Sequence, residues 1–282
     1  MKITHLKTLI SIALMSLAAC AGGQLSTLPP TATPTTPATM TPMQRAQAGK
    51  ALWEEKCRTV AGEKIYKTVE NVEGILLFKV RPPRSEREWA DPMWPGAAFA
   101  HELTTDGYIE SFLLFEQKLI GGRGHVDSLQ TSNPGYRYVD IIDEKDGQRY
   151  RYTGSNIIVG RKDINAPNVK ISLGRDPNYD LNIYGWVLNK TSAPDPSPRY
   201  AVTFEDHVIP EDRALGVASS TVKVIDLMTQ KVLGEMIRYV WSTPASSANP
   251  SPWLTAYKCG GEEIASTTRF FTDKVLKPLK GQ

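Results

Sequence analysis

The first twenty residues constrain this 282-residue chain most strongly, because they decide which part of it folds. Lys2 and Lys7 lie ahead of an apolar run over residues 9–17. Two small alanines and Cys20 follow that run. A basic start, a short apolar segment and small residues are the three parts of a secretory signal. The run is too short to cross the hydrocarbon core of a bilayer as a helix, so we expect this segment to be removed.

The end of the segment, Leu17-Ala18-Ala19-Cys20, resembles the lipobox of bacterial lipoprotein precursors. The resemblance covers only these first residues. It implies cleavage after Ala19, diacylation of the Cys20 thiol and acylation of the new amino terminus. Two or more acyl chains hold a protein durably on a membrane, whereas a single chain binds only marginally. The alternative is an ordinary signal peptide in which a cysteine lies near the cleavage site.

The residue after Cys20 bears on the membrane in which such an anchor would lie. Among lipoproteins of many Gram-negative bacteria, Asp at this position favours retention in the inner membrane. Here the position is Ala21. The resemblance therefore implies a lipid anchor in the outer membrane, with the folded domain facing the periplasm.

Residues 20–41 consist mostly of Gly, Ser, Thr, Ala and Pro. Such a segment has little to bury, and its prolines favour extended backbone, so we expect a tether between lipid and domain. The alternative is a loop packed on the domain. The expected organisation is thus a signal peptide over 1–19, a tether over 20–41 and a single periplasmic domain over 42–282, which is long enough for one large core.

The overall charge excludes one class of partner. The formal net charge is +3, and loss of Lys2 and Lys7 with the signal leaves +1. Nothing in that balance indicates a nucleic-acid partner. The expected partners are the membrane, through the lipid, and an envelope protein or glycan.

Three cysteines are present, and if Cys20 carries lipid, only Cys57 and Cys259 remain. In an oxidising periplasm two such cysteines most simply form one disulfide. A shared metal ion is the weaker alternative, because two thiols with no nearby histidine supply too few ligands for a tetrahedral site. The sequence predicts no metal site and no cofactor.

A helix start is visible directly after the tether. Thr41-Pro42-Met43-Gln44 has the pattern of an N-cap, a proline at the first helical position and a capping-box glutamine. Gly49, Trp53 and Cys57 then follow on one helical face. We expect Gly49 to let another backbone come close, and Ala61-Gly62 to end the helix.

The rest of the chain reads mainly as short strands with turn signals. Two hairpins are predicted, one around Asp143–Gly147 and one around Met228–Gln230. Residues 108–115 and 169–173 are also interpreted as strands, 81–101 as an irregular insertion, and 262–277 as a helix, although 266–271 would also pass as a strand. The predicted fold class is α+β, mainly antiparallel sheet with a helix near each end of the domain.

Histidines are the first candidates for catalysis. His125 lies in the glycine-rich stretch 121–127, which can be a phosphate-binding nest with acid–base groups or simply a β-loop. His207 is flanked by acidic residues, either a cation site or a solvated loop. No nucleophile motif accompanies them, and the catalytic residues stay unassigned.

Aromatic residues are the candidates for binding. Tyr136 and Tyr138 lie on one predicted strand, and Tyr150 and Tyr152 on its hairpin partner, so we expect their rings in cross-strand register. Trp94 lies in the irregular insertion. These rings can form an interaction surface, or they can pack within the domain and hold the insertion to it.

These observations predict a membrane-anchored periplasmic lipoprotein that acts as a binding, structural or accessory component of the cell envelope. A periplasmic hydrolase using His125 or His207 is one alternative. An immunity or exclusion lipoprotein, which blocks a toxin or an incoming element at the envelope, is another.

Overall fold

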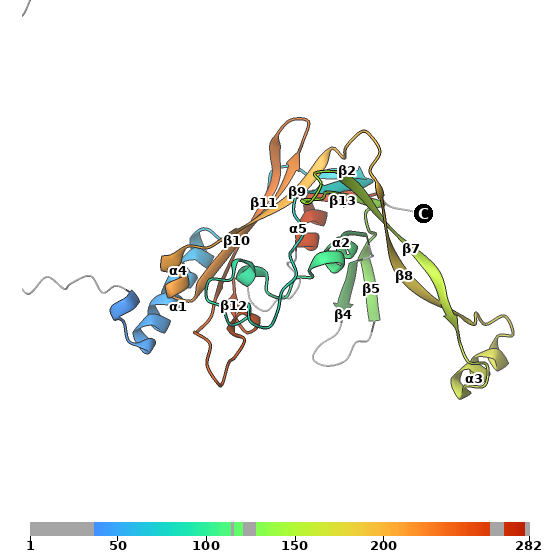
Figure 1. Cartoon of the computed structure of the whole chain (residues 1–282), viewed down its shortest axis with the longest axis horizontal. Coiled ribbons are helices and arrows are strands. Elements are labelled where there is room, and N and C mark those ends of the chain that lie inside the picture. Colours follow the sequence, from blue (N-terminus) through green and yellow to red (C-terminus); the bar gives the residue numbers. More distant parts are fainter. Residues whose placement is uncertain (1–36, 114–115, 121–127, 260–267, 280–282) are drawn as a thin grey trace, which may run out of the picture. The chain divides into compact units, whose positions relative to one another are not determined.

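A mixed β-sheet organises the described part of the chain, and its strands come from the whole length of the domain (Figure 1). The computed structural model describes residues 37–113, 116–120, 128–259 and 268–279, and these residues belong to one compact unit. The helices are α1 (Pro42–Thr59), α2 (Thr105–Leu113), α3 (Pro167–Arg175), α4 (Pro210–Ala214) and α5 (Thr268–Val275), with the 3-10 turns η1 (Pro37–Thr39), η2 (Pro95–Phe99) and η3 (Pro252–Leu254).

The strands are β1 (Gly62–Ile65), β2 (Val69–Val72), β3 (Gly74–Leu77), β4 (Glu116–Ile120), β5 (Ser128–Asn133), β6 (Tyr138–Ile142), β7 (Arg149–Arg161), β8 (Asn182–Ser192), β9 (Tyr200–His207), β10 (Val217–Asp226), β11 (Lys231–Trp241), β12 (Tyr257–Lys258) and β13 (Leu276–Pro278). Among the described residues, the main sheet has the order β1-β11-β10-β9-β3-β6-β7-β8, with β12 beside β11. Its pairs are antiparallel except where β3 runs parallel to β6 and β9. The predicted α+β class is confirmed.

The first helix begins where the sequence predicts. Thr41 Oγ1 accepts a hydrogen bond from the Gln44 amide at 3.3 Å, and Gln44 Oε1 accepts one from the Thr41 amide at 2.9 Å. Gly49 lies directly against the chain that follows α4. A Cβ atom there would lie 1.9 Å from the carbonyl oxygen of Leu215, so only glycine permits this approach.

The disulfide is also confirmed. Cys57, near the end of α1, is bonded to Cys259, just after β12, with their Cα atoms 5.2 Å apart. The bond joins residues 202 positions apart, so it closes most of the domain into one loop. Cross-links of this span restrict the unfolded chain strongly.

Two predicted strands are helices instead. Residues 108–113 lie in α2, where Tyr108, Ile109 and Phe112 are buried and the rings of Tyr108 and Phe112 meet at 5.4 Å. The spacing of four residues between these rings fits one helix face and overrides the strand preference of aromatic residues. Residues 169–173 lie in α3, which Pro167 opens as its first residue.

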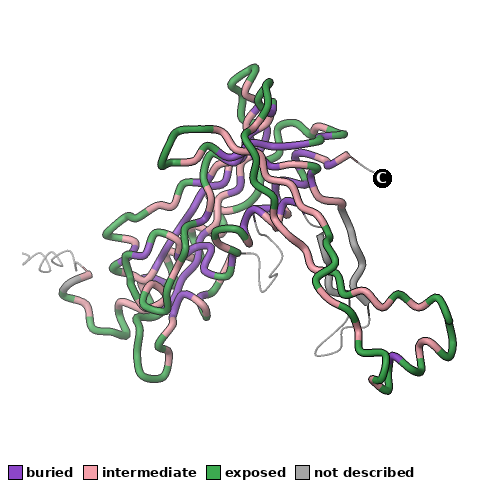
Figure 2. Tube along the Cα trace, turned by 45° about the vertical axis from the view of Figure 1, so that its right-hand side comes forward, coloured by how far each residue is buried: buried purple, intermediate pink, exposed green. Residues whose placement is uncertain are grey.

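The core lies where the sheet packs against α2, α5 and η2. Figure 2 shows buried residues concentrated on the central strands. Its large, completely enclosed side chains include Ile75 and Leu77 of β3, Val139 of β6, Phe112 of α2 and Phe271 of α5. The middle of the sheet is therefore the most solvent-excluded part of the domain.

The close contact at Gly49 leads to a stability prediction. Gly49→Ala is expected to lower the free energy of unfolding by about 1–3 kcal/mol, because the new methyl group overlaps a backbone oxygen. Gly174→Ala, in α3, is the matched control, since its Cβ would meet nothing within 4 Å. It should be neutral or stabilise by up to about 1 kcal/mol. Urea unfolding measures both; equal effects would contradict the prediction.

Candidate functional site

Two of the sequence-predicted sites lie outside the described residues. Cys20, the expected lipidation site, precedes residue 37, and the glycine-rich stretch with His125 falls within residues 121–127. The predictions for lipidation and for a catalytic role of His125 therefore stay predictions.

Trp94 belongs to the core. Its side chain is 7% exposed, and its ring lies over Gly96, where a Cβ atom would approach it to 2.7 Å. Trp89 is partly buried and packs on the same core. Of the two interpretations of these rings, packing of the insertion onto the domain is the one that the structure supports.

The four tyrosines do not form one surface. Tyr136 precedes β6, is 2% exposed, and donates from its hydroxyl to the Leu276 carbonyl oxygen at 2.8 Å. The ring of Tyr138 covers Gly74 of the neighbouring strand β3 and lies 3.6 Å from the Arg151 guanidinium carbon. Both rings are thus engaged inside the domain.

Tyr150 and Tyr152 lie on the other face of the hairpin. Tyr152 is opposite Val139 and Tyr150 is opposite Ile141, so neither tyrosine shares a face with Tyr138. The Lys190 ammonium lies 3.9 Å from the centre of the Tyr150 ring. The expected cross-strand register of tyrosines is therefore wrong, because the register places Tyr150 and Tyr152 opposite aliphatic residues of β6.

His207 ends β9, and its ring nitrogen Nε2 lies 3.2 Å from Thr221 Oγ1. Its acidic neighbour Asp206 points to Arg81. In the ranges that the structure describes, no cluster of three His, Cys, Asp or Glu side chains could hold a metal ion. Among the described residues, no carboxylate forms a hydrogen bond with the imidazole of His207.

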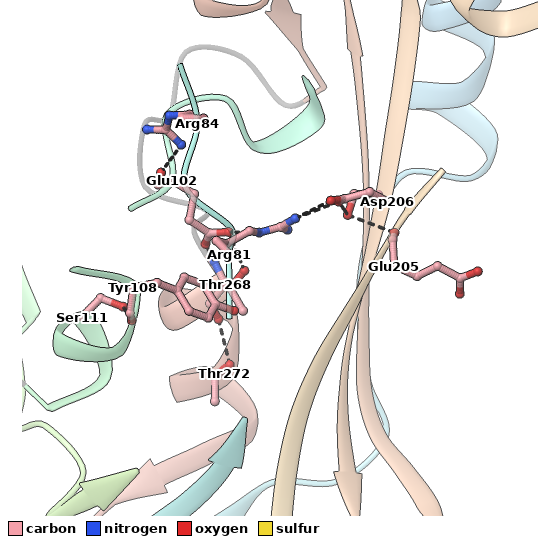
Figure 3. Close-up of polar contacts among 10 residues, drawn as sticks. Arg81, Arg84, Glu102, Tyr108, Ser111, Glu205, Asp206, Thr268 and Thr272 are labelled. Carbon is pink, nitrogen blue, oxygen red and sulfur yellow. Dashed lines mark hydrogen bonds and ion pairs between the residues drawn. The ribbon is translucent and has the colours of Figure 1, made fainter. Parts of the chain in front are cut away.

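Arg81 is the centre of a buried ionic network that sequence reasoning missed (Figure 3). Its Nε donates to Glu102 at 2.8 Å, and its Nη1 donates to both carboxylate oxygens of Asp206 at 2.8 Å. The guanidinium also stacks on the Phe204 ring at 3.6 Å. Burial alone would lower the pKa of Arg81, but the two carboxylates outweigh it and raise that pKa.

The same network reaches the C-terminal helix. Glu102 accepts hydrogen bonds from the amide and the hydroxyl of Thr268, the first residue of α5, at 2.7 and 3.0 Å. Asp206 accepts another from Ser220 at 2.7 Å. The network thus ties the irregular insertion, the sheet and α5 together. Because its carboxylates are occupied by these donors, it stabilises the fold rather than offering a free base.

A different part of the chain exposes unpartnered surface. Only residues 149–152 of β7 pair with β6. The pairing of β7 with β8 continues much further, from Tyr150 to Arg161. Residues 153–189 therefore form a two-stranded ribbon beyond the sheet, with α3 at its far end (Figure 1). We call these residues the arm.

The tip of the arm has its own ordering contacts. Lys162 donates to the Asp180 carbonyl oxygen at 2.7 Å, and its ammonium lies 4.3 Å from the centre of the Tyr179 ring. The Tyr184 hydroxyl donates to the Asp180 carboxylate at 2.8 Å. These contacts join the two ends of the segment between β7 and β8, which contains α3.

Large apolar side chains are exposed along the arm, and Figure 2 shows little buried surface there. They are Ile157, Ile158, Val159, Ile164, Ile171, Ile183 and Tyr184. Ile158 lies opposite Tyr184 on one face, and Ile157 lies opposite Gly185 on the other, so both faces are apolar. In the sequence, the run Ile157-Ile158-Val159 is apolar without alternation. Such a run is typical of a strand that other elements cover on both faces.

Comparison with protein-family models, with curated proteins and with solved structures finds no match for this chain. Within the described ranges, none of the helices has the length and apolar character needed to span a membrane.

Loss of the central guanidinium tests the role of the network. Arg81→Met should lower the free energy of unfolding by about 3–5 kcal/mol, because it leaves two carboxylates without their cation in a buried site. The control Arg137→Met breaks an exposed pair with Glu73 and should cost less than about 1 kcal/mol. Chemical denaturation compares them; a loss below 1 kcal/mol for Arg81→Met would contradict this role.

Proposed function

We propose that this chain is a lipid-anchored protein of the bacterial envelope that binds another envelope protein through the arm. The observation that carries the proposal is an ordered two-stranded ribbon with exposed apolar side chains on both of its faces. Contiguous exposed apolar surface of this kind marks interaction sites. The lipobox-like start supports the anchor, and the Cys57–Cys259 disulfide fits an oxidising compartment.

The backbone of the arm supports a protein partner rather than a glycan. In the described part of the chain, residues 153–158 of β7 pair with β8 alone, which leaves their other edge open. These residues include no charge and no proline, the usual protections of an open edge. An open edge favours a partner that adds a strand, and the flanking isoleucines supply apolar contact. Glycan recognition would favour exposed aromatic rings, and most of the exposed side chains here are aliphatic.

The proposed location of the lipid anchor is the outer membrane, with the folded domain in the periplasm. It rests on Ala21, which stands where an inner-membrane lipoprotein would carry Asp. The Pro- and Thr-rich residues 20–41 would act as the tether. A tethered domain can reach a partner at some distance from the lipid surface.

The mass of the native protein tests the anchor. Protein extracted from membranes should begin at Cys20 and carry added acyl chains. Cys57 and Cys259 should react with a thiol reagent only after reduction, because they form the disulfide. Mass spectrometry with and without reduction measures both. An unlipidated amino terminus would refute the anchor and leave the arm to be tested separately.

Site-specific photo-crosslinking in the native envelope tests the arm. A photoreactive residue at Ile158 or Ile171 should give the same protein adduct, because both side chains lie exposed on the arm. Met228, 76% exposed in the turn between β10 and β11, is the control position and should give no such adduct.

The variant Ile158→Asp should abolish the adduct formed from position 171, since it places a charge in the apolar contact. Its stability should change by less than about 0.5 kcal/mol, because Ile158 is 58% exposed. Equal adducts from the arm and from Met228, or none from the arm, would refute arm-mediated binding.

A further inference from the structure

A second feature, separate from the arm, is a cavity of about 90 Å³ between the 3-10 turn η2 and the strands β11 and β12. A water molecule takes up about 30 Å³ in the liquid, so the cavity has room for roughly three waters or one tetrahedral anion. His101 lines the cavity and is exposed, so the cavity opens to solvent at this residue. The apolar part of the lining consists of Ala97, Ala98, Phe99, Ala100, Val240 and Trp253.

The strand register directs two cationic side chains toward this cavity. Lys258 of β12 lies opposite Val240 of β11, and Arg238 precedes Val240 by two residues. Residues that lie opposite each other or alternate along a strand share one face of a sheet, so these three side chains point the same way. On that face, the Arg238 guanidinium carbon lies 4.2 Å from the centre of the Phe99 ring of η2. Both cations therefore line the space between the sheet and η2.

Lys258 is the unusual member of this lining. It is half-buried, and across the described ranges its ammonium makes no hydrogen bond or ion pair. Glu102 also lines the cavity, but its carboxylate accepts hydrogen bonds from Arg81 and from Thr268. Arg238 has other contacts, including the Phe99 ring, so Lys258 supplies the charge that lacks a partner.

The electrostatics of the two cations favour an anion between them. Burial lowers the pKa of Lys258, and the nearby charge of Arg238 lowers it further. Burial also lowers the pKa of Arg238 to about 10, with Arg81 acting in the same direction and Glu102 and Glu63 in the opposite one. The guanidinium therefore stays protonated at neutral pH. An anion in the cavity would offset both the burial and the repulsion between like charges.

We propose that this cavity binds a phosphate monoester group, carried by a small metabolite or by a lipid headgroup. The phosphate accepts hydrogen bonds from the Lys258 ammonium and the Arg238 guanidinium, two groups that commonly bind phosphate. A phosphate monoester carries about 1.5 to 2 negative charges at neutral pH, so it neutralises both cations, whereas a carboxylate neutralises one. The rest of the ligand extends through the opening at His101.

Calorimetric titration of the full-length protein distinguishes the two sources. Glycerol phosphate represents the metabolite, and glycerate, with one negative charge, is its control. Dihexanoyl phosphatidic acid below its micellar concentration represents the headgroup, and dihexanoyl phosphatidylglycerol, a diester with one negative charge, is its control. We expect at least one monoester to bind more tightly than its control by about tenfold or more, because it makes an additional charge-assisted contact. The monoester that binds more tightly identifies the source.

Variants assign that binding to Lys258. Lys258→Gln should weaken binding by about tenfold or more, and Lys258→Arg, which keeps the charge, should retain it. Lys231→Gln is the matched control, because Lys231 is exposed at the start of β11, and it should bind normally. Without ligand, Lys258→Gln should melt at the wild-type temperature or above it, since it removes a charge that Arg238 repels. Loss of binding is thereby separated from loss of folding.

The proposal is overturned if neither monoester binds, or if glycerate and the diester bind as tightly as the monoesters. It is also overturned if Lys258→Gln retains full affinity, or if Lys231→Gln weakens binding to the same extent. None of these results bears on the arm, whose crosslinks report a different surface.

Discussion

The buried guanidinium of Arg81 is the contact on which much of the domain depends. The segment that follows it, through residue 101, consists of turns and the short 3-10 turn η2 and pairs with no strand of the sheet. Arg81 connects this segment to Asp206 of β9 and, through Glu102, to the first turn of α5. Three parts of the chain far apart in sequence are thereby fixed to each other. A low-dielectric site makes such a network strong when paired and costly when broken.

Burial by neighbouring elements determines which strand segments belong to the core and which stay available for binding. At β6, Val139 and Asp140 point to opposite faces and both are buried, Asp140 through its pairs with Arg149 and Arg151. On the partner strand β7, six residues beyond Tyr152, which pairs with Val139, Ile158 faces solvent. The sequence of β7 is equally rich in strand-forming residues at both ends. The extent of pairing with β6 separates the half-buried part of β7 from the exposed arm.

Local patterns were predicted well because neighbours in sequence decide them. The cap at Thr41 and the two hairpins needed only residues within a few positions, and they are confirmed. The strand assigned to residues 108–115 was wrong because aromatic residues suit either structure until packing chooses. The predicted tyrosine register was wrong for a different reason. Alternation in the sequence shows which residues share a face of one strand, but not which residues of the neighbouring strand lie opposite them.

By itself the sequence determined the helix start, the hairpin turns, the fold class and the pairing of Cys57 with Cys259. Each of these depends on local backbone preference, on periodic burial or on the small number of cysteines. Only the tertiary structure decided that Arg81 meets Asp206, that Lys258 lines a cavity, and that the apolar residues of the arm stay exposed. These are contacts between distant residues, and their existence depends on how whole elements pack. A charged or apolar side chain carries no local signal of which distant surface it will meet.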